Sequence, residues 1–196
     1  MSIDLLPEFI RQMYEVHEWN HACAILHSDF LNEWKDIIAT LEEFRLRKSH
    51  IAVPGGRKSQ VSDWIDHKLG SCGWIEKGFQ TKRIVDKQIM DSPTHKIDCY
   101  KNQIALEIEW NNKDPFFDRD LNNFRLLFDL RAISVGIIVT RCDELQDIFD
   151  SLGRGKSYGT STTHMSKLLP RIQGGGGGGC PLLVLGISKK LYTEDI

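Results

Sequence analysis

The spacing of hydrophobic residues along the chain predicts several amphipathic helices. The clearest covers residues 29–45, where apolar residues recur at three- and four-residue intervals and therefore lie on one helical face. Residues 46–60 and 153–163 are polar and interrupted by glycine or proline, which predicts loops. Further helices are predicted by the same spacing over residues 61–69, 116–131, 143–152 and about 164–171.

Strand patterns separate these helices. Residues 103–110 alternate between apolar and polar positions, which is the period of a strand with one apolar face, and residues 95–100 form the preceding strand. Residues 133–140 and 182–187 are continuously apolar, as in strands that are buried on both faces. Strands that alternate with helices predict one α/β domain over residues 1–196, with a central mixed β-sheet flanked by helices.

Composition limits the class of protein. The chain is 41% hydrophobic and 27% charged, which is ordinary for a soluble globular domain, and it has neither an apolar run of membrane-spanning length nor a secretory signal. Its five cysteines are odd in number and never spaced as CxxC, which favours reduced thiols in a cytoplasmic protein. A net charge of −2 excludes a protein that coats nucleic acid by bulk charge, but allows positive charge confined to a cleft.

Three acidic residues gather around the predicted hairpin. A turn at Lys101-Asn102 brings Asp98 beside Glu107, and Glu109 lies on the same strand face as Glu107. Glu107 and Glu109 could simply be the solvated face of an edge strand. Three converging carboxylates, however, repel one another unless a cation lies among them, and oxygen-only ligands favour Mg²⁺. The motif therefore predicts a magnesium site of the kind that cleaves phosphodiester bonds.

A second motif indicates a different class of enzyme. Residues His17-Glu18-Trp19-Asn20-His21 match HExxH, which on a helix places two zinc-binding histidines and a glutamate base on one face. Tryptophan and asparagine are poor helix formers, and no third ligand follows at the usual spacing. A zinc peptidase is therefore the remote alternative.

Short segments spread over most of the chain carry a family pattern. In order and spacing they resemble the type II restriction endonucleases of the BglII and BstYI family, within the PD-(D/E)xK superfamily, with BamHI more distantly similar. The resemblance implies a restriction-endonuclease-like fold that cleaves DNA. The segments that carry it are Trp19-Asn20-His21-Ala22, Ile25-Leu26, Trp34-Lys35, the Asp98, Glu107 and Glu109 motif, Asp114-Pro115-Phe116-Phe117, Ser157-Tyr158 and Cys180-Pro181-Leu182-Leu183-Val184-Leu185-Gly186-Ile187.

The chain departs from the family pattern at a few positions. Ile97 stands where the superfamily often has proline. Glu109 stands where the superfamily often has lysine and the BglII and BstYI members have glutamine, although BamHI-like enzymes have glutamate there. The six glycines Gly174–Gly179 are too pliant for regular structure, and the pattern gives no reason for them.

The resemblance assigns roles around the metal. Asp98 and Glu107 would hold Mg²⁺, and the main-chain carbonyl of Ile108 would add a ligand. Glu109 would either take a proton from the attacking water or complete a second metal site, and the residues leave this choice open. Glu76 is a weaker candidate for a further acidic group.

DNA contacts are expected from loops and helix ends that border the metal site. Asn112 and Lys113 directly follow the catalytic strand, and the similar family position reads a base; asparagine pairs with adenine, and lysine with guanine or phosphate. The other candidates are cationic or hydroxyl-bearing residues: Arg57, Lys58, Arg119, Arg125, Arg154, Lys156, Ser157 and Tyr158.

The resemblance also implies partners. The substrate would be double-stranded DNA with a short palindrome, GATC-centred and cut to leave 5′ overhangs. Because one chain carries one site, cleavage of both strands implies a homodimer. A cognate DNA methyltransferase would protect the host. The alternatives within the same fold are a DNA repair nuclease and a DNA-binding relative that does not cleave.

Overall fold

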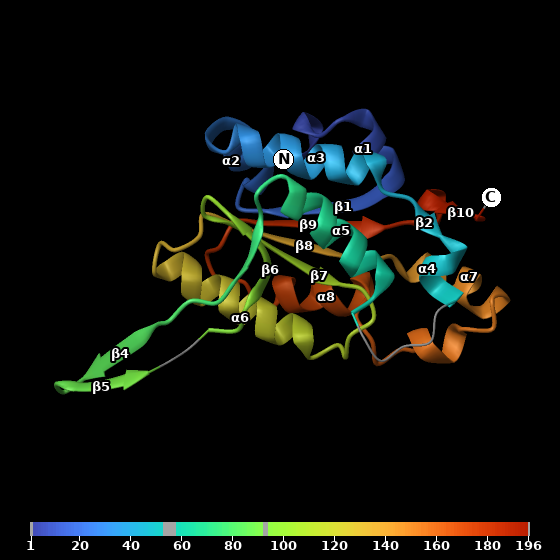
Figure 1. Ribbon diagram of the computed structural model, residues 1–196. Coiled ribbons are helices and arrows are strands. Elements are labelled where there is room, and N and C mark those ends of the chain that lie inside the picture. Colours follow the sequence, from blue (N-terminus) through green and yellow to red (C-terminus); the bar gives the residue numbers. More distant parts are fainter. Residues whose placement is uncertain (1, 53–57, 92–93, 196) are drawn as a thin grey trace.

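A mixed β-sheet organises the chain, as described by a computed structural model of residues 2–52, 58–91 and 94–195. Within these ranges six strands form one sheet in the order β1-β9-β8-β7-β6-β3 (Figure 1). The central strands β7, β8 and β9 run parallel, whereas β1, β6 and β3 pair antiparallel with their neighbours. The strands are β1 Tyr14–Trp19, β3 Ile75–Lys77, β6 Ile97–Lys101, β7 Ile104–Glu109, β8 Val135–Arg141 and β9 Leu182–Ile187.

Helices cover both faces of this sheet (Figure 1). One layer contains α1 Glu8–Met13, α2 Ala22–Asp29, α3 Leu31–Glu43 and α5 Gln60–Ser71. The opposite layer contains α6 Phe116–Asp129 and α8 Met165–Gln173. None of the helices in the described ranges is long and apolar enough to cross a membrane. The α/β class predicted from the sequence is therefore confirmed.

Shorter elements complete the chain. The β4–β5 hairpin extends away from the sheet (Figure 1). These elements are η1 Ser2–Leu5, β2 Leu46–Arg47 paired with β10 Tyr192–Thr193, α4 Lys48–Ala52, β4 Lys82–Val85 paired with β5 Gln88–Asp91, η2 Asp143–Leu145, α7 Gln146–Ser151, η3 Gly155–Tyr158 and η4 Lys189–Leu191.

Alternate residues of β7 enter two different cores. Ile104, Leu106 and Ile108 pack with the α1–α3 and α5 layer, whereas Ala105 packs with Phe117 of α6. Each buried aliphatic side chain stabilises the fold by about 1.5–3 kcal/mol. The two glutamates of β7 share the face of Ala105, because side chains alternate along a strand. They therefore point toward α6 and not toward solvent.

Three predictions about local structure were wrong. Residues 153–163 are not all loop, because η3 occupies Gly155–Tyr158. Residues 46–60 are not all loop, because β2 and α4 occupy 46–52; residues 53–57 lie outside the described part. The hairpin turn lies at Asn102-Gln103, one residue later than predicted, because Lys101 pairs with Ile104. Both turn residues have positive φ (43° and 67°), as a two-residue type I′ hairpin requires.

The glycine run packs tightly between α6 and β9. Gly178 has φ +57°, and a Cβ there would lie 2.7 Å from Cγ of Arg125. A Cβ on Gly177 would lie 2.6 Å from Cδ1 of Leu182. Close approach and left-handed backbone therefore explain glycine at these two positions.

We predict that Gly178→Ala lowers the free energy of unfolding by about 1–2 kcal/mol, because alanine is strained at positive φ. Gly179→Ala is the matched control, since its Cβ would meet Cε1 of Phe128 at an ordinary 3.7 Å. Urea unfolding of both variants measures the difference. Equal stability of the two variants would contradict this account of the run.

Candidate active site

Asp98 and Glu107 meet where the β6–β7 ladder ends. The backbone pairing runs from Lys101 and Ile104 to Cys99 and Leu106. Beyond it, the Asp98 N–H donates to Glu107 Oε2 at 3.2 Å, and the Ile108 N–H donates to Asp98 Oδ2 at 3.0 Å. Each carboxylate thus accepts a backbone N–H of the opposite strand, and this holds the two side chains side by side.

The main chain of Ile108 belongs to the same arrangement. Its N–H points toward Asp98, and the N–H and C=O of a strand residue point to the same edge. The Ile108 carbonyl therefore faces the side on which Asp98 lies. This placement is compatible with the predicted metal-ligand role of the carbonyl.

Glu109 lies further along β7 and is held by two neighbours. Its Oε2 accepts a hydrogen bond from Nδ2 of Asn112 at 2.7 Å, and its Oε1 lies 3.2 Å from Nη2 of Arg119. The side chain is nearly inaccessible to solvent. Burial, followed by the negative charge of Asp120, raises the pKa of Glu109 to about 9. The two partners therefore fix the orientation of the Glu109 side chain, and the raised pKa favours its protonated form.

A fourth carboxylate, Asp120 of α6, joins the site. Asp120 is fully buried, and its Oδ1 accepts from Nε of Arg119 at 2.9 Å. Burial raises its pKa to about 6 even though the charge of Arg119 opposes the shift. Burial and the charges of Asp120 and Asp98 likewise raise the pKa of Glu107 well above its ordinary value. The solvated-face interpretation of Glu107 and Glu109 is therefore wrong: both are buried at 1% exposure.

Two oxygens of this cluster show that it fits a cation. Glu107 Oε1 and Asp120 Oδ2 are buried and have no hydrogen-bond partner within the described residues. Buried acceptors without partners are costly, and a hard divalent ion prefers such oxygens. The described part of the chain nevertheless contains no group of three or more His, Cys, Asp or Glu side chains already arranged around one ion position.

An open hollow of about 540 Å³ gives access to Asp98 from the α5 side. Glu76 and Lys58, both predicted site residues, line it together with Asp98. Glu76 is exposed and paired with Lys96 at 2.7 Å, which lowers its pKa. Lys58 forms an ion pair with Asp66. Glu76 therefore lies at the solvent-exposed edge of the hollow, and it is separate from the buried carboxylates Glu107, Glu109 and Asp120.

The two loops predicted to contact DNA lie side by side. Lys113 forms an isolated β-bridge with Thr162, and the Asn112 N–H donates to Oγ1 of Thr163. Buried Arg141 braces this pair of loops, because its guanidinium donates to the Tyr158 carbonyl and to Oγ1 of Thr162. Exposed side chains on the two loops include Asn112, Lys113, Lys156 and Ser157, and Arg154 is half-buried.

Several predicted DNA contacts are placed elsewhere. Tyr158 is buried, stacks on Phe149 at 3.9 Å and accepts from the indole of Trp110, so its side chain belongs to the core. Arg125 pairs with Asn122 on the exposed side of α6 and does not join Arg119 at the carboxylates. Arg57 lies outside the described residues.

The structure argues against the remote HExxH alternative. His17 lies in β1, and His21 follows that strand with a positive φ of 60°. Glu18 accepts hydrogen bonds from Ser2 and from the Cys23 N–H. The two histidines are therefore not on one helical face, and the peptidase alternative loses its geometric basis.

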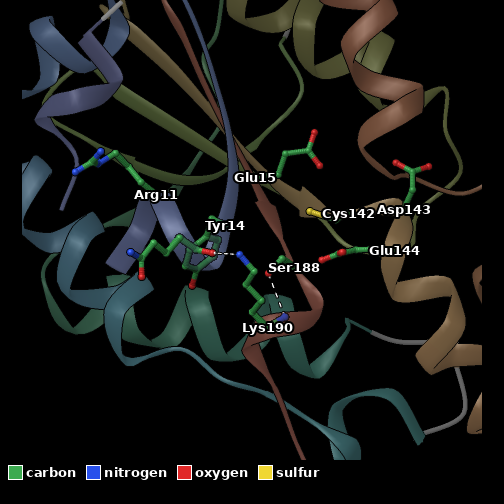
Figure 2. Close-up of a pocket in the computed structure, with 9 residues that line it drawn as sticks. Arg11, Tyr14, Glu15, Cys142, Asp143, Glu144, Ser188 and Lys190 are labelled. Carbon is green, nitrogen blue, oxygen red and sulfur yellow. Dashed lines mark hydrogen bonds between the residues drawn. The ribbon is translucent and has the colours of Figure 1, made fainter. Parts of the chain in front are cut away.

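A second hollow, of about 360 Å³, lies at the ends of β1, β8 and β9 (Figure 2). It holds none of the predicted site residues. Its lining carries both signs of charge, with hydrogen bonds from Lys190 to Ser188 Oγ and to the Gln12 carbonyl. Its lining residues are Arg11, Gln12, Tyr14, Glu15, Cys142, Asp143, Glu144, Ser188 and Lys190.

Sequence reasoning missed Asp120 and Arg141. A signal for Asp120 exists, because Asp120 and Asn123 interrupt the otherwise apolar inner face of α6, and both are buried. A polar side chain on a core-facing helix is a recognisable mark of a site. Arg141 only follows a buried strand, and its bracing role depends on loops that are distant in sequence.

A mixed sheet with acidic side chains at the end of a hairpin ladder is the architecture of restriction-endonuclease-like proteins. The comparison with protein families agrees: a model described as "Restriction endonuclease BglII/BglIII" matches residues 14–187, which is most of the chain. The chain therefore belongs to this family. It is a restriction endonuclease, a hydrolase whose substrate is double-stranded DNA, in a family that generally uses a divalent metal. No curated protein matches the chain.

We predict that the metal-free protein loses stability as the pH rises from about 5 to about 9. The folded state retains a proton on Glu109, whose pKa is about 9, over a range in which the unfolded chain has released it. Urea unfolding in chelator at several pH values measures the loss. Glu109→Gln should reduce the dependence, to which Glu107 and Asp120 also contribute because their pKa values are raised. Glu42→Gln, which removes an exposed carboxylate from the end of α3, should leave it unchanged. Stability that stays constant across this range would refute the assignment.

Proposed function

We propose that the chain is a Mg²⁺-dependent type II restriction endonuclease that acts as a homodimer. Its target is a short palindrome, GATC-centred and cut to leave 5′ overhangs. It works in the cytoplasm beside a DNA methyltransferase that protects the same sites.

One observation carries the proposal. Asp98 and Glu107 hold each other at the end of the β6–β7 ladder, and Glu107 Oε1 has no hydrogen-bond partner among residues 2–52, 58–91 and 94–195. Oxygen ligands of this kind favour Mg²⁺ over softer metals. Asp98, Glu107 and the Ile108 carbonyl are the residues that would hold the ion. Asp98 also lines the open hollow, so it is the carboxylate that an approaching phosphate reaches first.

A bound divalent ion would supply polarisation of the scissile phosphate and a lowered pKa for water. The residues of the chain orient the groups that take part in the reaction. Asn112 and Arg119 engage both oxygens of Glu109 and fix its orientation, which favours Glu109 as the group that orients water over Glu109 as a ligand of a second ion. The charge of a bound cation would lower the raised pKa of Glu109, so that it could also accept the proton of that water. Glu76 contributes charge at the mouth of the site.

The surroundings of the cluster supply cations for the DNA backbone. Lys58 lines the hollow beside Asp98, and Arg119 is one-third exposed next to Glu109. Lys113 and Lys156 lie on the braced loops that follow β7 and α7. These positions suit phosphate contacts, and exposed Asn112 and Ser157 suit contacts to base edges.

The homodimer follows from the number of active centres. Each chain supplies one pair of Asp98 and Glu107 carboxylates, and a double-strand cut at a palindrome needs two centres related by a twofold axis. Cleavage at symmetric positions on both strands is the expected signature.

We predict that purified protein cuts a defined plasmid into discrete fragments only when Mg²⁺ is present. Asp98→Asn and Glu107→Gln should each reduce cleavage by at least about 10³-fold and preserve DNA binding, since each removes a negative charge from the DNA-facing site. End mapping of the fragments gives the target, the overhang and the symmetry of the cut in one experiment.

The matched control is Glu43→Gln, which removes an exposed carboxylate of α3 that pairs with Lys68. It should cut like the wild type. Wild-type turnover in Asp98→Asn would reject the metal assignment. Metal-dependent but sequence-independent cutting would point to a repair nuclease, and binding without cutting to an inactive relative.

We also predict that Lys113→Met weakens DNA binding and lowers the dependence of log K on log salt by about one unit, because one phosphate contact is lost. Fluorescence anisotropy at several salt concentrations measures this slope. Lys189→Met, at a lysine that pairs with Glu144, is the control and should leave the slope unchanged. An unchanged slope in Lys113→Met would move the DNA path away from the loop after β7.

A further inference from the structure

Asp120 is an ionisable residue at a position where the fold expects an apolar one. It lies between Phe117 and Phe124 on the inner face of α6, and it is fully buried. A buried carboxylate lowers stability unless it is paired or binds a cation. Its presence there calls for a positive partner.

Arg119 satisfies only half of this requirement. Its Nε donates to Asp120 Oδ1 at 2.9 Å, and its Nη2 lies 2.8 Å from the same oxygen. Asp120 Oδ2 has no hydrogen-bond partner among the described residues. Arg119 is also shared, because the same Nη2 lies 3.2 Å from Oε1 of Glu109. One guanidinium therefore serves two carboxylates, and Asp120 Oδ2 receives no hydrogen bond from any residue that the structure describes.

The oxygen without a partner on Asp120 has a counterpart on β7. Glu107 Oε1 is likewise buried and has no hydrogen-bond partner in the described part of the chain. Among the neighbouring charges that act on Glu107, the largest is that of Asp120. Both acidic side chains are buried in the contact between α6 and the face of β7 that carries Ala105 and Glu107, one from the helix and one from the sheet. Their spare oxygens are the two least satisfied atoms of the cluster.

We propose that Asp120 is a fourth carboxylate of the divalent-cation centre and binds the cation together with Glu107. This inference rests on the proposed metal-dependent function and extends the centre from the β6–β7 hairpin to α6. The cation takes over the charge compensation that Arg119 provides in the free protein. The Arg119 side chain is one-third exposed and stacks on Phe116 at 4.1 Å, so it has a path to solvent and to a DNA phosphate.

The contacts of the free protein agree with the proposal that a cation replaces Arg119 as the positive charge beside Asp120. No set of three acidic, histidine or cysteine ligands is preformed within the described ranges. Arg119 binds Asp120 Oδ1 and Glu109 Oε1, and backbone N–H groups bind Asp98 Oδ2 and Glu107 Oε2. Asp120 Oδ2 and Glu107 Oε1 are therefore the oxygens available to a cation, and its positive charge would free Arg119 for a DNA phosphate.

The test is a calorimetric titration of the full-length protein with Mn²⁺ in the absence of DNA. Asp120→Asn should weaken Mn²⁺ binding by at least about tenfold. Asp118→Asn is the matched control, because Asp118 lies on the same helix but is exposed and pairs with Arg171. It should bind Mn²⁺ within about twofold of the wild type.

Thermal unfolding separates a cation-binding role from a merely structural one. In chelator, Asp120→Asn should melt at or above the wild-type temperature, because it removes a charge from a crowded buried cluster. Saturating Mn²⁺ should raise the wild-type melting temperature by about 2–4 °C more than that of Asp120→Asn. If Asp120 only anchors Arg119, the variant melts lower in both conditions and gains the same increment from Mn²⁺, which overturns the proposal.

Glu107→Gln distinguishes failure of this inference from failure of the nuclease mechanism. If Glu107→Gln abolishes Mn²⁺ binding and Asp120→Asn leaves it unchanged, Asp120 is not part of the centre and the function stands. If the wild type binds no Mn²⁺, both proposals fall. Similar losses of Mn²⁺ affinity in Glu107→Gln and Asp120→Asn support a cation centre formed by both β7 and α6.

Discussion

The structure depends on a conflict between burial and charge at the junction of β7 and α6. The hydrophobic effect places α6 on the sheet through Phe117, Leu121 and Phe124, and this packing also buries Glu107 and Glu109. Asp120 adds another acidic group from the helix side. Such a cluster is tolerated because the surrounding apolar core stabilises the fold by more than the cluster destabilises it. The site is therefore held in a state that a cation would relieve.

The end of the hairpin ladder gives this cluster its geometry. Regular antiparallel pairing would use the backbone groups of Asp98 and Ile108 within the sheet. Here their N–H groups bind the carboxylates of Glu107 and Asp98 instead. A rigid backbone thus orients two side chains that would otherwise repel each other. Preorganisation of this kind places the reacting groups before the substrate arrives, which is how a scaffold contributes to rate.

The two loops that Arg141 braces are also held in place before DNA binds. Arg141 is a buried cation, and burial lowers its pKa to about 10. Its guanidinium donates hydrogen bonds to the loop that contains Tyr158 and Thr162. That loop pairs with Lys113, directly after the catalytic strand. The segment that would read DNA is thereby tied to the strand that would cut it. A substitution in either loop should therefore alter both DNA recognition and cleavage, because the two loops share backbone hydrogen bonds.

Periodicity in the sequence was sufficient for the α/β class, for the central strands, and for Asp98 and Glu107 at one hairpin, because these features depend on local spacing. The family was indicated separately, by the resemblance of short segments in their order and spacing. Only the tertiary structure decided that Glu107 and Glu109 are buried, that Tyr158 belongs to the core, and that Asp120 and Arg141 complete their surroundings. The HExxH motif failed for the same reason: its residues lie in a strand because β1 pairs with β9. Burial and pairing between distant segments depend on the packing of the whole chain, which local patterns do not encode.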